Sequence, residues 1–193
     1  MKNKQFVISV MSKDRPGIIS DVTTVIYDLG GDLAGLNQSV LGGYFTMILM
    51  VEFPEGVTVE TLMKTFSAIG TEPAIEAIIK EVDGVYMYDN RVLPGETYVV
   101  TAQGGNRKGL VKLLGDFFYA RAINVLDLVT ARRDELYTMI FQVDLSHIES
   151  MNKLRKELVL LAGKENLDVV LQHNDIYMAT NEVGLPLDAI IGG

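Results

Sequence analysis

Residues 6–53 carry the sequence FVISVMSKDRPGIISDVTTVIYDLGGDLAGLNQSVLGGYFTMILMVEF, and residues 98–145 repeat its pattern as YVVTAQGGNRKGLVKLLGDFFYARAINVLDLVTARRDELYTMIFQVDL. The two stretches align without a gap at an offset of 92 positions, as Asp14 and Asn106 illustrate (106 − 14 = 92). An internal duplication defines the unit of folding before any single motif does. The chain is therefore a module of about 90 residues that is present in two copies.

Strand and helix signals alternate in the same order in both copies. Apolar and β-branched runs predict strands over 6–11, 32–40, 44–53 and 76–82, and over 98–103, 124–130, 136–145 and 167–172. Apolar residues at a spacing of three to four predict helices over 18–29, 59–69, 110–118 and 148–161. The order strand, helix, strand, strand, helix, strand is typical of the ferredoxin-like fold. We therefore expect an α+β protein of two tandem ferredoxin-like βαββαβ modules, each an antiparallel sheet with helices on one face.

The ends of the first helix and the faces of the third strand add detail. Asp14 is predicted to be the N-cap of this helix, with Pro16 in its first turn, and Gly30 to end it in a left-handed conformation. Apolar Ile48 and Met50 lie on the strand face opposite the main apolar row. This pattern predicts that the open face of each sheet packs against another module, within the chain or in a homo-oligomer.

A short linker motif and the composition of the chain indicate its domain organisation. Leu93-Pro94-Gly95 is typical of a linker, so we expect a first domain over residues 1–92, a second over 93–183, and a tail over 184–193 without regular structure. No run approaches the roughly 18 apolar residues of a membrane span. The chain lacks cysteine, which excludes disulfides and fits a reducing cytoplasm.

Charge and chemistry argue against several classes of function. The net charge is −8, and the short basic clusters at 132–133 and 153–156 have acidic neighbours, so direct nucleic-acid binding is not expected. His147 and His173 are 26 positions apart with no cysteine to help, which gives poor support for a metal site. No pair of acids and no nucleophile with its base can be argued from spacing. We expect neither an enzyme nor a bound cofactor.

Three segments resemble the ACT domain family of regulatory modules: residues 12–18 (SKDRPGI), 36–47 (LNQSVLGGYFTM) and 169–176 (VVLQHNDI). The resemblance covers nearly all of residues 4–183 as two tandem copies. The tandem layout is most similar to the glycine cleavage system transcriptional repressor family. The resemblance implies a ferredoxin-like fold and regulatory binding of an amino acid where modules meet.

The loop between the first strand and the first helix offers chemistry that suits such a ligand. A helix start presents unpaired N–H groups to a carboxylate, and a glycine lets ligand atoms come close. The neighbouring strand brings amides and a hydroxyl. The candidate ligand residues of the first module are Asp14, Arg15, Pro16, Gly17, Ile18, Asn37, Gln38 and Ser39. A purely structural alternative stays open, in which Asp14 only caps the helix and Pro16-Gly17 only shapes a turn.

The second copy keeps less of this pattern. Asn106 replaces Asp14, Lys108 replaces Pro16, and Val129 and Thr130 replace the two amides. Ligand binding is less expected there, although the basic side chains can attract an anion. Its candidate residues are Asn106, Arg107 and Gly109.

These observations favour a non-catalytic regulatory protein. It would bind a small amino acid, resembling glycine or serine, and act through a partner protein on the expression of genes for glycine metabolism. The alternative is a protein–protein interaction module that binds no small molecule.

Overall fold

The computed structural model describes residues 3–70, 72–82 and 93–180. The chain divides into two compact units, Met1–Arg91 and Val92–Gly193. The predicted tail over 184–193 lies outside the described residues. Within the described ranges, no helix has the length and apolar character needed to cross a bilayer.

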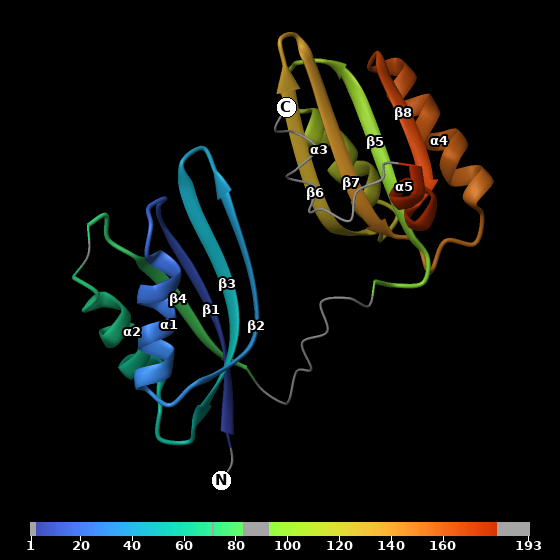
Figure 1. Cartoon of the computed structure of the whole chain (residues 1–193). Coiled ribbons are helices and arrows are strands. Elements are labelled where there is room, and N and C mark those ends of the chain that lie inside the picture. Colours follow the sequence, from blue (N-terminus) through green and yellow to red (C-terminus); the bar gives the residue numbers. More distant parts are fainter. Residues whose placement is uncertain (1–2, 71, 83–92, 181–193) are drawn as a thin grey trace. The chain divides into compact units, whose positions relative to one another are not determined.

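The first unit contains one sheet and two helices. Its elements are β1 (Asn3–Lys13), α1 (Ile18–Asp28), β2 (Asp32–Leu41), β3 (Tyr44–Pro54), α2 (Val59–Ser67) and β4 (Glu76–Val82). The four antiparallel strands lie in the order β2-β3-β1-β4, and both helices cover the same face of the sheet (Figure 1).

The second unit repeats this architecture and adds one helix. Its elements are β5 (Thr97–Gly105), α3 (Leu110–Tyr119), β6 (Asn124–Arg133), β7 (Leu136–Asp144), α4 (Met151–Lys164), β8 (Leu167–His173) and α5 (Asn174–Thr180). The antiparallel strand order is β6-β7-β5-β8. The prediction of two tandem ferredoxin-like α+β modules is confirmed, and α5 is a helix that the sequence patterns did not predict.

Alternation along the third strand of each unit builds the core. Every second residue of β3 is buried and packs with apolar residues of α1 and α2: Phe45, Met47, Leu49, Val51 and Phe53. In β7 the same positions bury Met139, Phe141 and Val143. On the opposite face Ile48 is 56% exposed, so the prediction that another module covers this face stays a prediction.

The start of α1 differs from the prediction. Its N-cap is Gly17 rather than Asp14, and the helix begins at Ile18, so Pro16 precedes the first turn. Asp14 instead extends the pairing of β1 with β3, and its N–H donates to the carbonyl oxygen of Gly43 in the β2–β3 turn, at 2.9 Å. The cap prediction for Asp14 was wrong because the strand's backbone pairing extends to this residue and delays the helix.

Both first helices end in the same motif. Gly30 has φ 71°, as predicted, and Ala122 at the matched position has φ 53°. In each unit the following N–H donates to the carbonyl oxygen five residues before it, from Gly31 to Ile26 and from Ile123 to Phe118. This left-handed C-cap satisfies helix carbonyls and is favoured by glycine.

The residue at this C-cap gives a stability prediction. We expect Ala122→Gly to raise the free energy of unfolding of the second unit by about 0.5–1 kcal/mol, because relief of the left-handed penalty exceeds glycine's entropic cost. Denaturant-dependent amide exchange of β5 and β7 measures this change. Gly30→Ala serves as the matched control and should destabilise the first unit. A loss of stability in Ala122→Gly would contradict the argument.

The two cores differ in where the aromatic volume lies. In the first unit Gly31 leaves no room for a side chain, since a Cβ there would lie 2.4 Å from Phe53 Cε1 and 2.9 Å from Ile26 Cγ2. In the second unit the residues that match Ile26, Gly31 and Phe53 are Phe118, Ile123 and Leu145, and all three are buried. The first two are larger than their counterparts, and Leu145 is smaller than Phe53. Each unit therefore fills the same space with a different division of side-chain volume.

Candidate functional site

The first helix of each unit begins without a side-chain cap. α1 follows Gly17 and α3 follows Gly109, with φ values of 92° and 89°. By contrast, the hydroxyl of Thr58 caps α2 and that of Ser150 caps α4, each accepting from a backbone N–H three residues later. The first turns of α1 and α3 therefore present N–H groups that no capping side chain engages, in the manner of an anion-binding helix end.

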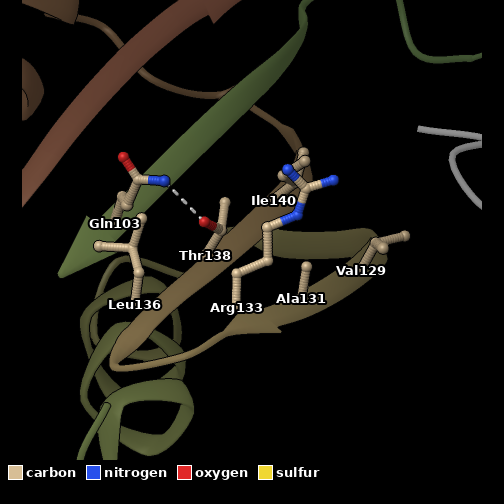
Figure 2. A pocket seen from close by; sticks show the side chains of 7 residues that line it. All are labelled: Gln103, Val129, Ala131, Arg133, Leu136, Thr138 and Ile140. Atoms are coloured by element: carbon tan, nitrogen blue, oxygen red, sulfur yellow. Dashed lines mark hydrogen bonds between the residues drawn. The ribbon is translucent and has the colours of Figure 1, made fainter. Parts of the chain in front are cut away.

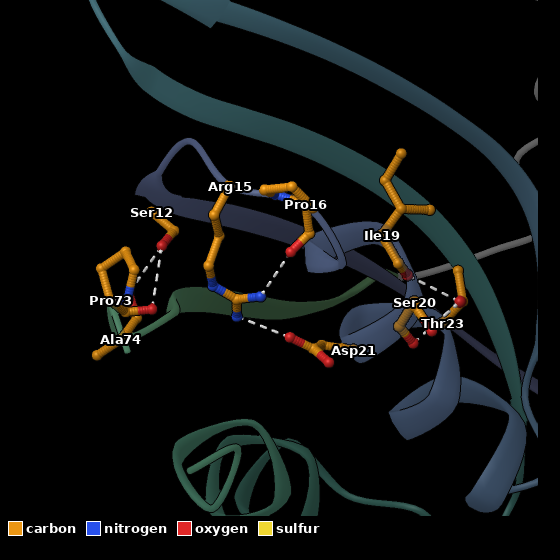
Figure 3. Close-up of polar contacts among 9 residues, drawn as sticks. All are labelled: Ser12, Arg15, Pro16, Ile19, Ser20, Asp21, Thr23, Pro73 and Ala74. Atoms are coloured by element: carbon orange, nitrogen blue, oxygen red, sulfur yellow. Dashed lines mark hydrogen bonds and ion pairs between the residues drawn. The ribbon is translucent and has the colours of Figure 1, made fainter. Parts of the chain in front are cut away.

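The loop before α1 is anchored to the strands on both sides of it. Ser12, which is buried, donates through Oγ to the carbonyl oxygen of Ala74 at 3.0 Å, close to the start of β4 (Figure 3). Asp14 is tied to the β2–β3 turn through its backbone. The side chains of Asp14 and Pro16 are exposed. These anchors fix the loop backbone while leaving its outer surface open to solvent.

Arg15 contacts the helix that follows it. Its Nη2 lies 2.7 Å from Asp21 Oδ2, and its Nη1 donates to the carbonyl oxygen of Pro16 at 3.1 Å (Figure 3). The Arg15 and Asp21 side chains are mostly buried, at 17% and 26% exposure. Asp21 also lies in the first turn of α1, where a negative charge is favoured. The guanidinium therefore holds the loop against the helix start.

The matched loop of the second unit is held by a different element. Leu113 occupies the position of Asp21, and Arg107 instead forms an ion pair with Glu165, the C-cap residue of α4. Asn106, Arg107 and Gly109 are all exposed. The two loops have a left-handed glycine at the same position, and they differ in the acidic residue that pairs with their arginine.

Two further candidates, Ile18 and Asn37, lie away from the exposed loop surface. Ile18 is 1% exposed and belongs to the core, so only its backbone can meet a ligand. On β2, Gln38 pairs with buried Met47 and shares the helix-covered face, whereas Asn37 pairs with Ile48 on the open face. The structure therefore does not bring the two amides together.

Ser39 follows Asn37 on the open face. Its Oγ lies 3.1 Å from Thr46 Oγ1, the hydroxyl directly opposite on β3. Of the three candidate ligand residues on β2, only Gln38 projects to the side of the sheet where α1 begins. Period-two alternation already separates Gln38 from its neighbours, and this signal was available in the sequence.

The open face of the second sheet contains a hollow that the sequence reasoning missed. Its volume is about 240 Å³, and Gln103 Nε2 donates to Thr138 Oγ1 across one side at 2.9 Å (Figure 2). It is lined by Gln103, Val129, Ala131, Arg133, Leu136, Thr138 and Ile140. Val129 and Ala131 match Asn37 and Ser39, so the polar β2 positions have become part of an apolar surface.

The described residues contain no group of three or more His, Asp or Glu side chains that could hold a metal ion. His147 Nε2 lies 3.0 Å from the carbonyl oxygen of Arg121, and the His173 ring packs edge-on against Tyr98 with centroids 5.0 Å apart. Both histidines thus have local structural contacts.

Two tandem ferredoxin-like modules define the architecture of this chain, and comparisons with known proteins identify its family. The family model of the ACT domain matches residues 4–77. A UPF0237 protein of Methanopyrus kandleri is 34% identical over 86 residues, covering 44% of this chain and 96% of the relative. A UPF0237 protein of Streptococcus mutans is 41% identical over 64 residues, covering 33% and 73%. The chain belongs to the ACT domain family.

Two solved structures share the tandem fold. A protein provisionally described as a glycine cleavage system transcriptional repressor has a TM-score of 0.68 at 16% identity, covering 89% of this chain and 98% of its own. A protein of unknown function from Galdieria sulphuraria has a TM-score of 0.67 at 18% identity, covering 89% and 99%. At these identities the likeness concerns the fold. ACT domains are regulatory modules that bind amino acids.

Proposed function

We propose that this chain is a non-catalytic regulatory protein whose first unit binds a small amino acid, of the size of glycine or serine, at the start of α1. The observation that carries the proposal is the uncapped first turn of α1 behind the left-handed Gly17. An α-carboxylate can accept hydrogen bonds from these N–H groups and is favoured by the positive end of the helix dipole. Membership of the ACT family supports the amino-acid class.

The surroundings of this helix start favour a compact ligand. Arg15 is already paired with Asp21, so the carboxylate would rely mainly on backbone N–H groups. Gly17 adds no side chain above the helix end, and Gln38 lies on the same side of the sheet as α1. Isothermal titration calorimetry with the twenty amino acids tests the proposal. The absence of both heat and thermal shift for all of them would refute it.

The two amides of β2 give a sharper prediction. We expect Gln38→Ala to weaken ligand binding about tenfold, roughly 1.4 kcal/mol, because a lost hydrogen bond in a binding site costs about this much. Asn37→Ala should bind within about twofold of the unchanged protein, because its side chain projects to the opposite face. Titration calorimetry of both variants measures the difference. Equal losses in the two variants would show that the ligand does not lie on the α1 side.

Regulation would act through the arrangement of the modules and a partner protein. A ligand shifts the equilibrium between two arrangements of the modules only by binding one arrangement more tightly than the other. The acidic charge of −8 disfavours direct contact with DNA phosphates, so we place any control of glycine-related genes one step away, through a partner. The partner, the homo-oligomer and the cytoplasmic location expected from the sequence belong to this proposal.

A second candidate is a ligand-free docking module. The observation in its favour is the Arg15–Asp21 ion pair, which stabilises the loop without any ligand. A regulated partner interaction that persists when no amino acid binds, and that survives Gln38→Ala unchanged, would favour this candidate.

A further inference from the structure

The guanidinium of Arg15 lies directly at the start of α1. Its Nη1 is 3.6 Å from the position that a Cβ atom on Gly17 would occupy, which is ordinary van der Waals contact. The same nitrogen donates to the carbonyl oxygen of Pro16 at 3.1 Å (Figure 3). Because Gly17 is the N-cap of α1, the positive charge of Arg15 stands at the N-terminal end of this helix.

Asp21 holds this cation from within the helix. Its backbone N–H donates to the carbonyl oxygen of Gly17 at 2.9 Å, so it stands one turn into α1. Side chains on a helix lean toward the N-terminus, so the carboxylate of Asp21 reaches back over the first turn. Its Oδ2 lies 2.7 Å from Arg15 Nη2, and both side chains are mostly buried (Figure 3). A fixed negative charge therefore lies beside the proposed ligand site.

The second unit has the matched arginine and a different partner for it. Leu113 occupies the position of Asp21, and its N–H donates to the carbonyl oxygen of Gly109 at 2.9 Å. Arg107 pairs with Glu165, the C-cap residue of α4, and both side chains of this pair are more exposed than those of Arg15 and Asp21. The first unit instead holds its arginine with an acid of the very helix at which the ligand is proposed to bind.

The negative charge of Asp21 limits what can bind at the α1 start. One ligand carboxylate is balanced by the N–H groups and the dipole of the helix. A second acidic group on the ligand would come close to Asp21, and like charges at close range are strongly unfavourable. Arg15 cannot offset this repulsion, because its charge is already neutralised by Asp21. A ligand with an uncharged side chain meets no such repulsion.

We propose that Asp21 is a specificity-determining residue, which holds the Arg15 guanidinium so that the α1 start accepts amino acids with uncharged side chains and rejects acidic amino acids and dianions. The inference rests on the proposed amino-acid site and adds the chemical class of its ligand. Removal of the Asp21 carboxylate would leave a guanidinium beside an uncapped first turn, and these two features together suit a doubly charged anion.

The variant Asp21→Leu copies the residue of the second unit and tests the proposal in the full chain. NMR spectra of the amides of Gly17, Ile18 and Ile19 follow titration with aspartate and, separately, with inorganic phosphate. We expect Asp21→Leu to bind both probes at least about tenfold more tightly than the unchanged protein, because a repulsion is removed and a charge-assisted hydrogen bond is gained. Asp21→Asn, which keeps the shape of the side chain, should change both affinities in the same direction.

Two controls identify the group responsible for the gain. Asp28→Asn removes the same charge at the other end of α1, roughly 15 Å from Ile18 along the helix. It should leave both affinities within about twofold, because that distance exceeds the screening length at physiological salt. Adding Arg15→Gln to Asp21→Leu should cancel the gain, since the freed guanidinium is the proposed contact. Partial unfolding of a variant cannot produce a gain of binding.

Three outcomes would overturn the proposal. The first is equal binding of both probes by Asp21→Leu, Asp21→Asn and the unchanged protein. The second is a gain that persists after Arg15→Gln, and the third is binding of aspartate by the unchanged protein as tightly as glycine or serine. The phosphate titration needs no amino-acid ligand, so it reports on Asp21 even where calorimetry finds no amino acid that binds. Failure of this inference is therefore distinguishable from failure of the proposed function.

Discussion

Gly31→Ile is expected to destabilise the first unit by about 3 kcal/mol or more, because inserting carbon atoms into a well-packed core costs about 1–3 kcal/mol and occasionally more. A Cβ at this position already lies 2.4 Å and 2.8 Å from two atoms of the Phe53 ring. Phe53 is 0% exposed and cannot move aside into solvent. Urea denaturation, followed by amide exchange of β1 and β3, measures the loss.

The second unit supplies the matched rescue. It tolerates Ile123 at this position because Leu145 replaces the ring and Phe118 restores the volume from the helix. We therefore expect the triple variant Gly31→Ile, Phe53→Leu and Ile26→Phe to recover most of the stability that Gly31→Ile loses. Additive losses, with the triple variant less stable than any single one, would show that the two cores are not interchangeable in this way.

Gly17→Val is expected to abolish the thermal stabilisation of the protein by the amino-acid ligand that we propose. A β-branched residue at φ 92° is a strained outlier, costing roughly 1–3 kcal/mol, so the first turn of α1 would rearrange to relieve the strain. The N–H groups that we propose bind the ligand carboxylate would then lose their common direction. Differential scanning fluorimetry with and without the amino acid identified by calorimetry measures this response.

Gly109→Val provides the control, since φ at this glycine is 89° and it occupies the same place before α3. Its cost in stability should be similar, while the ligand response should remain, because the proposed site lies in the first unit. If Gly17→Val kept the response, or if both variants lost it equally, the assignment of the ligand to the α1 loop would be wrong.

Fold class followed from the sequence with little ambiguity, because duplication supplied two independent copies of each pattern. The alternation of buried and more exposed residues along β3 recurs along β7. Helix boundaries were less predictable: Asp14 has the chemistry of an N-cap, but it is hydrogen-bonded to the β2–β3 turn. Hydrogen bonding between strands that are distant in sequence places Asp14 outside the helix. Local helix propensity does not contain this information.

The backbone geometry of the candidate loop was predictable from the sequence, whereas the face on which each strand residue lies was not taken into account. Gly17 and Gly109 stand where a left-handed residue is required, and their recurrence in both copies marks that need. The amides of Asn37 and Gln38 were grouped because they are neighbours in sequence, although alternate residues of a strand project to opposite faces. α5 was missed because residues 174–180 form only two turns, held by contacts with β5 and β8 rather than by a strong helical pattern.

The sequence by itself determined that this protein is one α+β module in two copies, because strand and helix periodicities are local and survive divergence. Only the tertiary structure decided which residues share a face, which acid restrains each loop arginine, and how Gly31 and Ile123 can occupy the same place in two cores. Those outcomes depend on steric fit and charge between segments that are far apart in the chain. The size of a side chain at one core position limits the side chains that can pack against it from distant segments. Local sequence patterns do not contain this constraint.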